Sequence, residues 1–324
     1  MYLTIEAPLK EAGKKDKLSI PAQVFLNHFH ALCTHLTCHK DNYDLNKIPY
    51  FEKKLFSKKD FDLARVKKVL YNSWSSEHAL HLTGKQELPD YYRYALHWSF
   101  PQAYYSCYLN MHAFCLATGD PSDSHHKIIL GFGDRVKRNT YPKCISFYAE
   151  GNYKNYTYEN LPLHQPKKAL SLLKDEIAVQ SQIASFLRST RSNKAEYHRD
   201  KRQRSDNPIR TNGSKQIALK FNKAQWLEIT KKLGPTSLFD ILYRLRIKAN
   251  YNDIETFMHA EINFKQFHDC LAGIVGYLNF VHECYLAKAI GYRKYEMILD
   301  GFPAHLSDSF VRKRYEVLIK SQIK

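Results

Sequence analysis

Cysteine pairs of the form Cys-x-x-Cys are missing from this sequence, although it contains seven cysteines. Their absence argues against a zinc ribbon and against a disulfide framework, because both need cysteines at short, regular spacings. Most of the cysteines lie in apolar segments, where a free thiol behaves as a small hydrophobic group. A reducing cytoplasm is therefore the expected compartment.

The sequence also lacks an apolar run near the roughly 20 residues that would span a bilayer. Its first residues, Met1–Pro8, have neither the basic block nor the apolar block of a secretory signal peptide. We therefore expect no membrane among the partners of this protein.

The motifs of several common enzyme classes are missing as well. Without a Walker loop, a nucleophile elbow or a paired-carboxylate motif, kinase, hydrolase and dehydrogenase functions have no support. Gly131-Phe-Gly133 is a glycine pair without the strand-turn-helix context of a dinucleotide site. We predict no cofactor.

Histidine and cysteine are concentrated between residues 28 and 39. On a helix His35 and His39 would share a face and could bind a transition metal. Cys33 and Cys38 would point elsewhere, and no second group of ligands is evident. We prefer amphipathic packing with exposed histidines and predict no metal site.

Acidic residues are scarce relative to basic ones: 32 Asp and Glu stand against 49 Lys and Arg, which gives a net charge of +17. Such an excess attracts polyanions, most commonly nucleic acid, although an acidic protein partner would also explain it. The hydrophobic fraction of 44% is ordinary for a folded globular protein. A length of 324 residues allows two domains, or one domain with a large insertion.

Apolar residues recur at helical spacing over most of the chain, which predicts a mainly α-helical protein. Residues 40–58 are polar, contain Pro49 and are expected to form a loop. The expected helices cover roughly residues 21–39, 60–81, 90–117, 123–132, 223–233, 236–249, 263–289 and 308–319, and a further long helix starts near residue 167 and runs past residue 188.

A small β element is expected in the middle of the chain. Alternation in Ile145–Ala149 and Tyr153–Tyr158 predicts an antiparallel hairpin with its turn at Gly151-Asn152, and Ile217–Phe221 could add a third strand. Tyr153 and Tyr156 of this hairpin are candidates for stacking on unpaired bases. Ordinary packing of tyrosines in a strand is the alternative.

Two helical segments carry the most informative pattern. The first has Tyr104-Tyr105 in an apolar helix, a glycine stop at Gly119, and His125-His126 opening a short helix. The second is Arg246-Ile-Lys-Ala-Asn-Tyr251. In this order they resemble the two halves of a HEPN domain, a helical bundle common in prokaryotic toxin, RNA-cleavage and antiviral systems, with Asn250 replacing the usual acidic residue.

The resemblance implies a HEPN-like bundle in two halves, residues 60–136 and 235–291. Residues 137–234 would be an insertion with the β hairpin and a long basic helix. Residues 1–59 would form an N-terminal helical extension and residues 292–324 a basic C-terminal tail. Within the bundle, a cap or an edge hydrogen bond is the preferred role of His125 and His126, and we expect Arg246 to pair with Asp253 or Glu255.

Ribonucleases of this superfamily usually carry an arginine, four to six further residues and then a histidine, and they need no metal. Only Arg191 and His198 have this spacing here, and a seven-residue step puts both side chains on one face of a helix. The resemblance implies that the histidine transfers a proton and that the arginine stabilises charge on the phosphate. A solvated or phosphate-contacting face is the alternative, because such a pair arises easily by chance in a basic segment.

The same segment, residues 188–204, is basic and lacks large aliphatic side chains, so it should face solvent or a partner. Its candidates for contact with nucleic acid are Arg188, Lys194, Arg199, Lys201, Arg202 and Arg204.

These features predict an RNA-directed, HEPN-like protein of a prokaryotic antiviral defence or toxin-type system. By the resemblance, it would be a cytoplasmic homodimer and, if it cuts RNA, a metal-independent endoribonuclease. The alternative is a non-catalytic scaffold or sensor subunit that docks a partner protein or nucleic acid. The lack of an Arg–His motif within the bundle itself favours that alternative.

Overall fold

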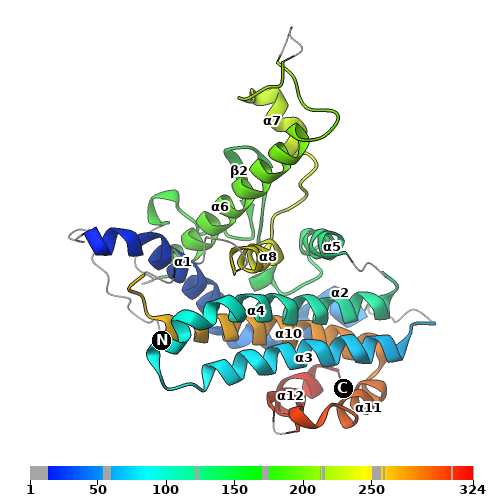
Figure 1. Ribbon diagram of the computed structural model, residues 1–324. Coiled ribbons are helices and arrows are strands. Elements are labelled where there is room, and N and C mark those ends of the chain that lie inside the picture. Colours follow the sequence, from blue (N-terminus) through cyan, green and yellow to red (C-terminus); the bar gives the residue numbers. More distant parts are fainter. Residues whose placement is uncertain are drawn as a thin grey trace.

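The computed structural model is mainly α-helical and, among the residues that it describes, has one antiparallel sheet of two strands, as predicted. Figure 1 shows a helical bundle from which α6 and α7 project as an arm. The structure describes residues 14–53, 60–120, 124–169, 175–211, 213, 216–249, 257, 260–307 and 309–323.

Three long helices form the centre of the bundle: α3 (Leu63–Gly84), α4 (Pro89–Thr118) and α10 (Phe264–Ile290). The side chains of Asp62 and Asn263 accept backbone N–H groups in the first turns of α3 and α10, which fixes where these helices begin. At its other end α4 stops at Gly119, whose φ of 84° is a conformation that favours glycine.

Among the described helices, α10 alone is long and apolar enough to cross a membrane by length and composition. However, 83% of its most apolar 18-residue window is buried inside the protein. A helix that is apolar on all sides is equally what the centre of a large core requires.

Both ends of the described chain belong to the same hydrophobic core as the bundle. At the N-terminal end, α1 (Lys14–Thr37) buries Phe29 and Leu32 against it. At the C-terminal end Tyr295 and Tyr315 are buried, so neither the boundary expected at residue 59 nor the one at 292 separates two cores.

The C-terminal elements are α11 (Tyr292–Asp300), η6 (Ala304–Leu306), α12 (Phe310–Arg314), the π-helical turn η7 (Tyr315–Ile319) and α13 (Lys320–Ile323).

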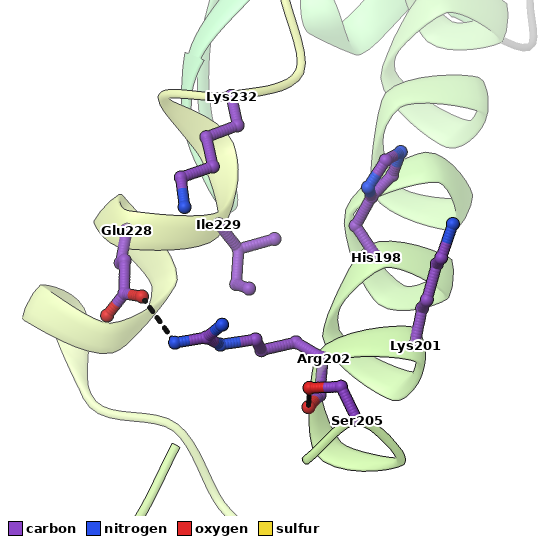
Figure 2. A pocket seen from close by; sticks show the side chains of 7 residues that line it. All are labelled: His198, Lys201, Arg202, Ser205, Glu228, Ile229 and Lys232. Atoms are coloured by element: carbon purple, nitrogen blue, oxygen red, sulfur yellow. Dashed lines mark hydrogen bonds and ion pairs between the residues drawn. The ribbon is translucent and has the colours of Figure 1, made fainter. Parts of the chain in front are cut away.

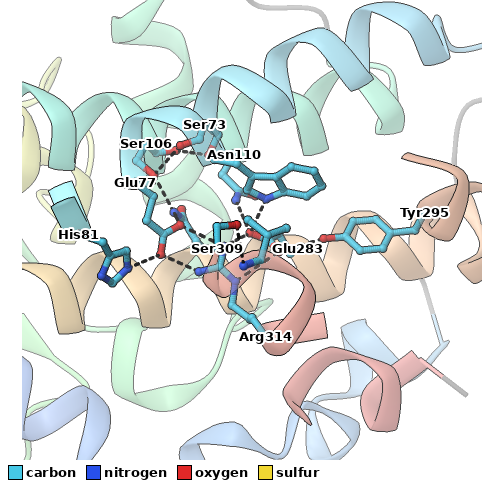
Figure 3. A network of polar contacts seen from close by, with 12 residues as sticks. Ser73, Glu77, His81, Ser106, Asn110, Glu283, Tyr295, Ser309 and Arg314 are labelled. Carbon is cyan, nitrogen blue, oxygen red and sulfur yellow. Dashed lines mark hydrogen bonds and ion pairs between the residues drawn. The ribbon is translucent and has the colours of Figure 1, made fainter. Parts of the chain in front are cut away.

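A buried ionic network holds this C-terminal segment to the bundle (Figure 3). The Arg314 guanidinium donates to Glu77 of α3, with N–O distances of 2.6 and 3.0 Å, and to Glu283 of α10. Burial would raise the pKa of Glu77, but Arg314 and neighbouring donors outweigh this and lower it to about 2. Burial raises the pKa of Glu283, and the Glu77 carboxylate adds to that effect while Arg314 opposes it.

Between the bundle and the arm lie α5 (His125–Lys137), α8 (Leu238–Ala249) and the hairpin of β1 (Tyr148–Asn152) and β2 (Asn155–Glu159). The hairpin was predicted, but its turn is at Tyr153-Lys154 instead of Gly151-Asn152. Asn152 pairs with Asn155, and Lys154 adopts the left-handed conformation with φ of 65°. Gly133 of α5 allows a close approach to the segment before α8, because a Cβ there would lie 2.9 Å from Pro235 Cγ.

α6 (Glu176–Gln203) begins in the core and ends outside it. Its first half buries Ile183, Phe186 and Leu187, whereas its second half leaves the bundle and meets α7 (Lys223–Thr230). We call residues 188–233 the arm; it has a small core of its own, formed by Ile209, Ala218 and Ile229 with Phe221 packed against them.

Several expected element boundaries need correction. Pro21 lies inside α1, which begins seven residues earlier at Lys14. Asp175 caps α6, so that helix starts at Glu176 and not near Lys167, where the chain forms the turn η4 (Pro166–Lys168). Residues 40–53 of the expected loop contain η1 (Lys40–Tyr43), η2 (Leu45–Lys47) and α2 (Pro49–Lys53).

The third strand expected at Ile217–Phe221 does not form in the described residues. Ile217 makes only an isolated antiparallel bridge to Arg210, while the neighbouring Ala218 enters the small core of the arm. A strand would need a continuous ladder of backbone hydrogen bonds, and that segment has no partner strand to supply it.

Candidate nucleic-acid interface

The arm concentrates the positive charge of the protein. Residues 188–233 contain 13 of the 49 lysines and arginines but only 4 of the 32 acidic residues. The arm projects away from the bundle (Figure 1), although Lys194 near its base pairs with Asp240 of α8. Positive charge that remains unneutralised on a projecting element favours contact with a polyanion.

The six predicted cations of α6 and its end fall into two groups. Arg188, Lys201 and Arg204 are exposed and form no ion pair within the described part of the chain. The other three are paired and contribute less free charge: Lys194 with Asp240 (2.7 Å), Arg199 with Asp200 (2.7 Å) and Arg202 with Glu228 (3.6 Å).

Arg191, predicted as a catalytic residue, is a buried structural anchor with only 2% of its surface exposed. Its guanidinium donates to the backbone carbonyls of Gly234 (2.8 Å) and Gly151 (3.0 Å) and to the hydroxyl of Thr236 (3.0 Å). These bonds fasten α6 to β1 and to the start of α8. A guanidinium held in this way does not fit the expected contact with an RNA phosphate.

The two hairpin tyrosines are also engaged within the protein. The ring of Tyr153 stacks on Trp226 of α7 with centroids 3.7 Å apart, and its hydroxyl donates to Glu196 (2.6 Å). Tyr156 lies beneath the Arg191 guanidinium, 5.5 Å from its ring centroid, and its hydroxyl bonds to Ser192. Packing is the role that this structure gives them, and the face of Tyr153 toward Trp226 is closed to a base.

A basic pocket of about 290 Å³ opens between α6 and α7 (Figure 2). In Figure 2 His198 and Lys201 project from α6, and Lys232 reaches down from the end of α7. Arg202 crosses from one side to the other and meets Glu228. The lining residues are His198, Lys201, Arg202, Ser205, Glu228, Ile229 and Lys232. One carboxylate and three cations give the pocket a net positive charge suited to a phosphate group.

His198, the other predicted catalytic residue, lies at the junction of arm and bundle. It is half-buried, and its ring centroid is 6.3 Å from that of His126 at the start of α5. Burial lowers the pKa of His198, and Lys194, His126 and Lys201 lower it further. The structure therefore pairs His198 with another histidine and not with Arg191.

The residues that carry the family resemblance meet at this junction too. Tyr104 hydroxyl and His125 Nδ1 form a hydrogen bond of 2.7 Å, the edge contact that the sequence analysis preferred for this histidine. The Arg246 guanidinium carbon lies within 5.9 Å of the ring centroids of Tyr104, Tyr105 and Tyr243. Arg246 Nε donates to the Tyr105 hydroxyl (3.1 Å). Three helices, α4, α5 and α8, supply this aromatic cluster.

The neighbouring Arg244 is structural, because it donates to the hydroxyls of Ser189 (2.8 Å) and Thr190 (3.1 Å) and so ties α8 to α6. The expected partners of Arg246, Asp253 and Glu255, lie outside the described residues, as do Asn250 and Tyr251 of the sequence motif.

The described residues hold no group of three or more His, Cys, Asp or Glu side chains that could bind a metal ion. His35 and His39 do share a face of the chain, and both approach Glu176, at 3.3 and 4.0 Å. Those three residues form ion-pair contacts, with His35 mostly buried and His39 exposed.

Sequence reasoning missed two parts of this site. Trp226 is one of three tryptophans, and only the fold brings it against Tyr153. Lys232 could have been suspected from the Lys231-Lys232 pair, but its approach to α6 depends on the packing of α7. In comparisons with protein-family models, with curated proteins and with solved structures, the chain matches none.

Proposed function

We propose that this chain is an RNA-directed, HEPN-like protein of a prokaryotic antiviral defence or toxin-type system, and that its arm binds RNA. The observation that carries the proposal is the net positive charge of the arm on a projecting, structured element. Phosphate groups neutralise such a surface and release bound counterions, which makes binding strong at low salt.

Two features favour RNA over an acidic protein as the polyanion. The pocket between α6 and α7 is of a size and charge for a phosphate group. In addition, the residues that resemble the HEPN signature, Tyr104, Tyr105, His125 and Arg246, come from three helices and lie in contact with one another. By that resemblance the protein would act as a cytoplasmic homodimer, with one arm on each copy.

The test measures binding of a random-sequence single-stranded RNA pool at several salt concentrations. Replacing Lys201, Arg204 and Lys232 together with glutamine should weaken binding and reduce the slope of log affinity against log salt by about 2, because three phosphate contacts are lost.

The matched control replaces three exposed lysines of the bundle and C-terminal segment, Lys68, Lys85 and Lys313, with glutamine. It changes the net charge by the same amount and should leave most of the binding intact. Equal losses in the two triple variants would mean that the arm is not the interface.

A non-catalytic scaffold or sensor subunit is the second candidate, and the burial of Arg191 favours it. The expected Arg–His pair is not available as a catalytic unit when its arginine is fixed to backbone carbonyls. Failure of the unaltered protein to bind RNA, together with recovery of a stable protein complex that the arm variant cannot form, would establish this candidate instead.

A further inference from the structure

The histidine pair at the junction of arm and bundle is not explained by packing alone. His126 is exposed on the first turn of α5, and His198 is half-buried on α6. Their ring centroids are 6.3 Å apart and the rings are tilted by 41°. Within the described part of the chain neither imidazole has a hydrogen-bond partner, so the ring nitrogens are open to a ligand.

The charges around this pair would attract a phosphate. Lys201 is exposed on the same helix as His198, and both side chains line the basic pocket beside Lys232. The charge of Lys194 also lowers the pKa of His198, although Lys194 is itself paired with Asp240. The acidic residue of the pocket, Glu228, is engaged by Arg202. A phosphodiester bound here would meet two imidazoles and at least two free ammonium groups.

We propose that His126 and His198 form the acid–base pair of a metal-independent RNA cleavage site, with an adjacent phosphate of the RNA seated in the basic pocket. This inference rests on the proposed binding of RNA by the arm. It replaces Arg191 by His126 as the partner of His198, and it draws the reacting groups from α5 and α6, so that the arm and the bundle each supply one.

The step balances without a co-reactant. A neutral imidazole takes the proton of the ribose 2′-hydroxyl, and the 2′-oxygen forms a bond to phosphorus. The bond from phosphorus to the 5′-oxygen breaks, and that oxygen receives a proton from the other imidazole in its protonated form. Lys201 stabilises the charge on the phosphoryl oxygens. The products are a 2′,3′-cyclic phosphate and a free 5′-hydroxyl.

Burial and the nearby cations keep His198 neutral near pH 7, which suits it to accept the first proton. His126 is then the proton donor. The rate should fall as the pH is lowered through the depressed pKa of His198, because its protonated form cannot act as a base.

The experiment measures binding and cleavage separately on the random-sequence RNA pool, with a chelator present. His126→Asn and His198→Asn should each reduce the cleavage rate by about 10²- to 10⁴-fold and leave RNA affinity within a few-fold. The control is His305→Asn, an exposed histidine of η6 that is hydrogen-bonded to Ser75 of α3. This control variant should cleave RNA at the rate of the unaltered protein.

Two further measurements, of the chemical ends of the products and of cleavage of a modified RNA, test the proposed reaction step. Cyclic phosphate ends support the proposed step, and RNA with 2′-O-methyl groups throughout should bind without being cut. RNA that is bound but not cleaved by the unaltered protein overturns the inference and leaves the proposed binding intact. So does cleavage that survives both histidine substitutions. Absence of RNA binding by the unaltered protein overturns the proposed function itself.

Discussion

In the bundle Arg314 lies buried between two glutamates, whereas in the arm Lys201 and Arg204 lie exposed without an ion pair in the described residues. Burial of a charge is tolerated only with partners, so the bundle neutralises the positive charge it encloses. The arm leaves these two cations in solvent, where they contribute little to stability and are free to meet a partner.

The two regions also differ in how much apolar surface they enclose. The bundle core runs through nearly every helix of the described chain, while the arm has only Ile209, Ala218 and Ile229 with a share of Phe221. A core this small cannot fix the arm by hydrophobic burial alone. Specific anchors must do so, namely Arg191 on the backbone of β1 and Gly234, and Tyr153 stacked on Trp226.

This contrast separates stability from function along the chain. Substitutions of charged residues in the bundle should act on unfolding, and those of exposed charges in the arm should act on binding. Substitutions of the anchors of the arm should affect both unfolding and binding, because these residues hold a binding element in place.

The largest effect is expected from Arg314→Met. It leaves Glu77 and Glu283 buried without their cation and should lower the free energy of unfolding by about 3–5 kcal/mol. Urea denaturation followed by circular dichroism measures this. The control is Arg312→Met, which removes an exposed arginine of the same helix α12 that pairs with Asp300 of α11, and it should cost less than about 1 kcal/mol. Equal losses would show that the network adds nothing beyond a surface pair.

The same network has a pH signature. Because the folded-state pKa of Glu77 lies at about 2, below its usual 4.5, its contribution is fully present above pH 4.5 and is lost as the pH falls toward 2. Arg314→Met should therefore flatten this part of the acid dependence of stability.

The next effect concerns the anchor of the arm. Arg191→Ala removes three hydrogen bonds and should cost about 2–3 kcal/mol, detectable as a lower thermal midpoint. Arg188→Ala, three residues earlier and exposed, is the control and should be nearly neutral. A catalytic role for Arg191 would instead predict lost cleavage with unchanged stability.

A smaller effect is expected at the aromatic stack. Tyr153→Ala removes the ring that covers Trp226, and stacked aromatic pairs contribute about 0.5–1.5 kcal/mol beyond their area. Amide hydrogen exchange should become faster in α7 and remain unchanged in α10. Tyr197→Ala, which removes an aromatic ring that is 65% exposed on α6, should leave exchange in α7 as it was.

The smallest effect on stability is expected at the exposed cations. Arg204→Gln should change the free energy of unfolding by less than about 0.5 kcal/mol while reducing RNA affinity at low salt. Isothermal titration and urea denaturation on the same sample compare the two quantities. A clear loss of stability in Arg204→Gln would contradict the proposed difference between arm and bundle.

Much of the helical architecture could be predicted, because a buried helical face leaves a period in the sequence. The stripe of Phe267, Leu271, Ile274 and Leu278 placed α10 within a few residues. The hairpin was also found, but its turn was not, since Gly151-Asn152 is a common turn pair and Lys154 is a rare residue at positive φ. Element ends failed where tertiary packing, as at Leu45 and Phe51, gave order to a polar segment.

The site could be predicted only in part. Local spacing put Arg191 and His198 on one helical face, but spacing does not say what else approaches that face. The carbonyls of Gly151 and Gly234 come from distant segments, and they turn a plausible catalytic arginine into an anchor. His126 reaches His198 for the same reason, because the fold brings the first turn of α5 close to α6.

The sequence by itself determined the class of fold, the hairpin and the basic segment, because periodicity and charge are properties of neighbouring residues. Only the tertiary structure decided which cations are exposed, which arginines are buried and which histidines meet. Those outcomes depend on contacts between residues far apart in the chain, and no local pattern specifies them.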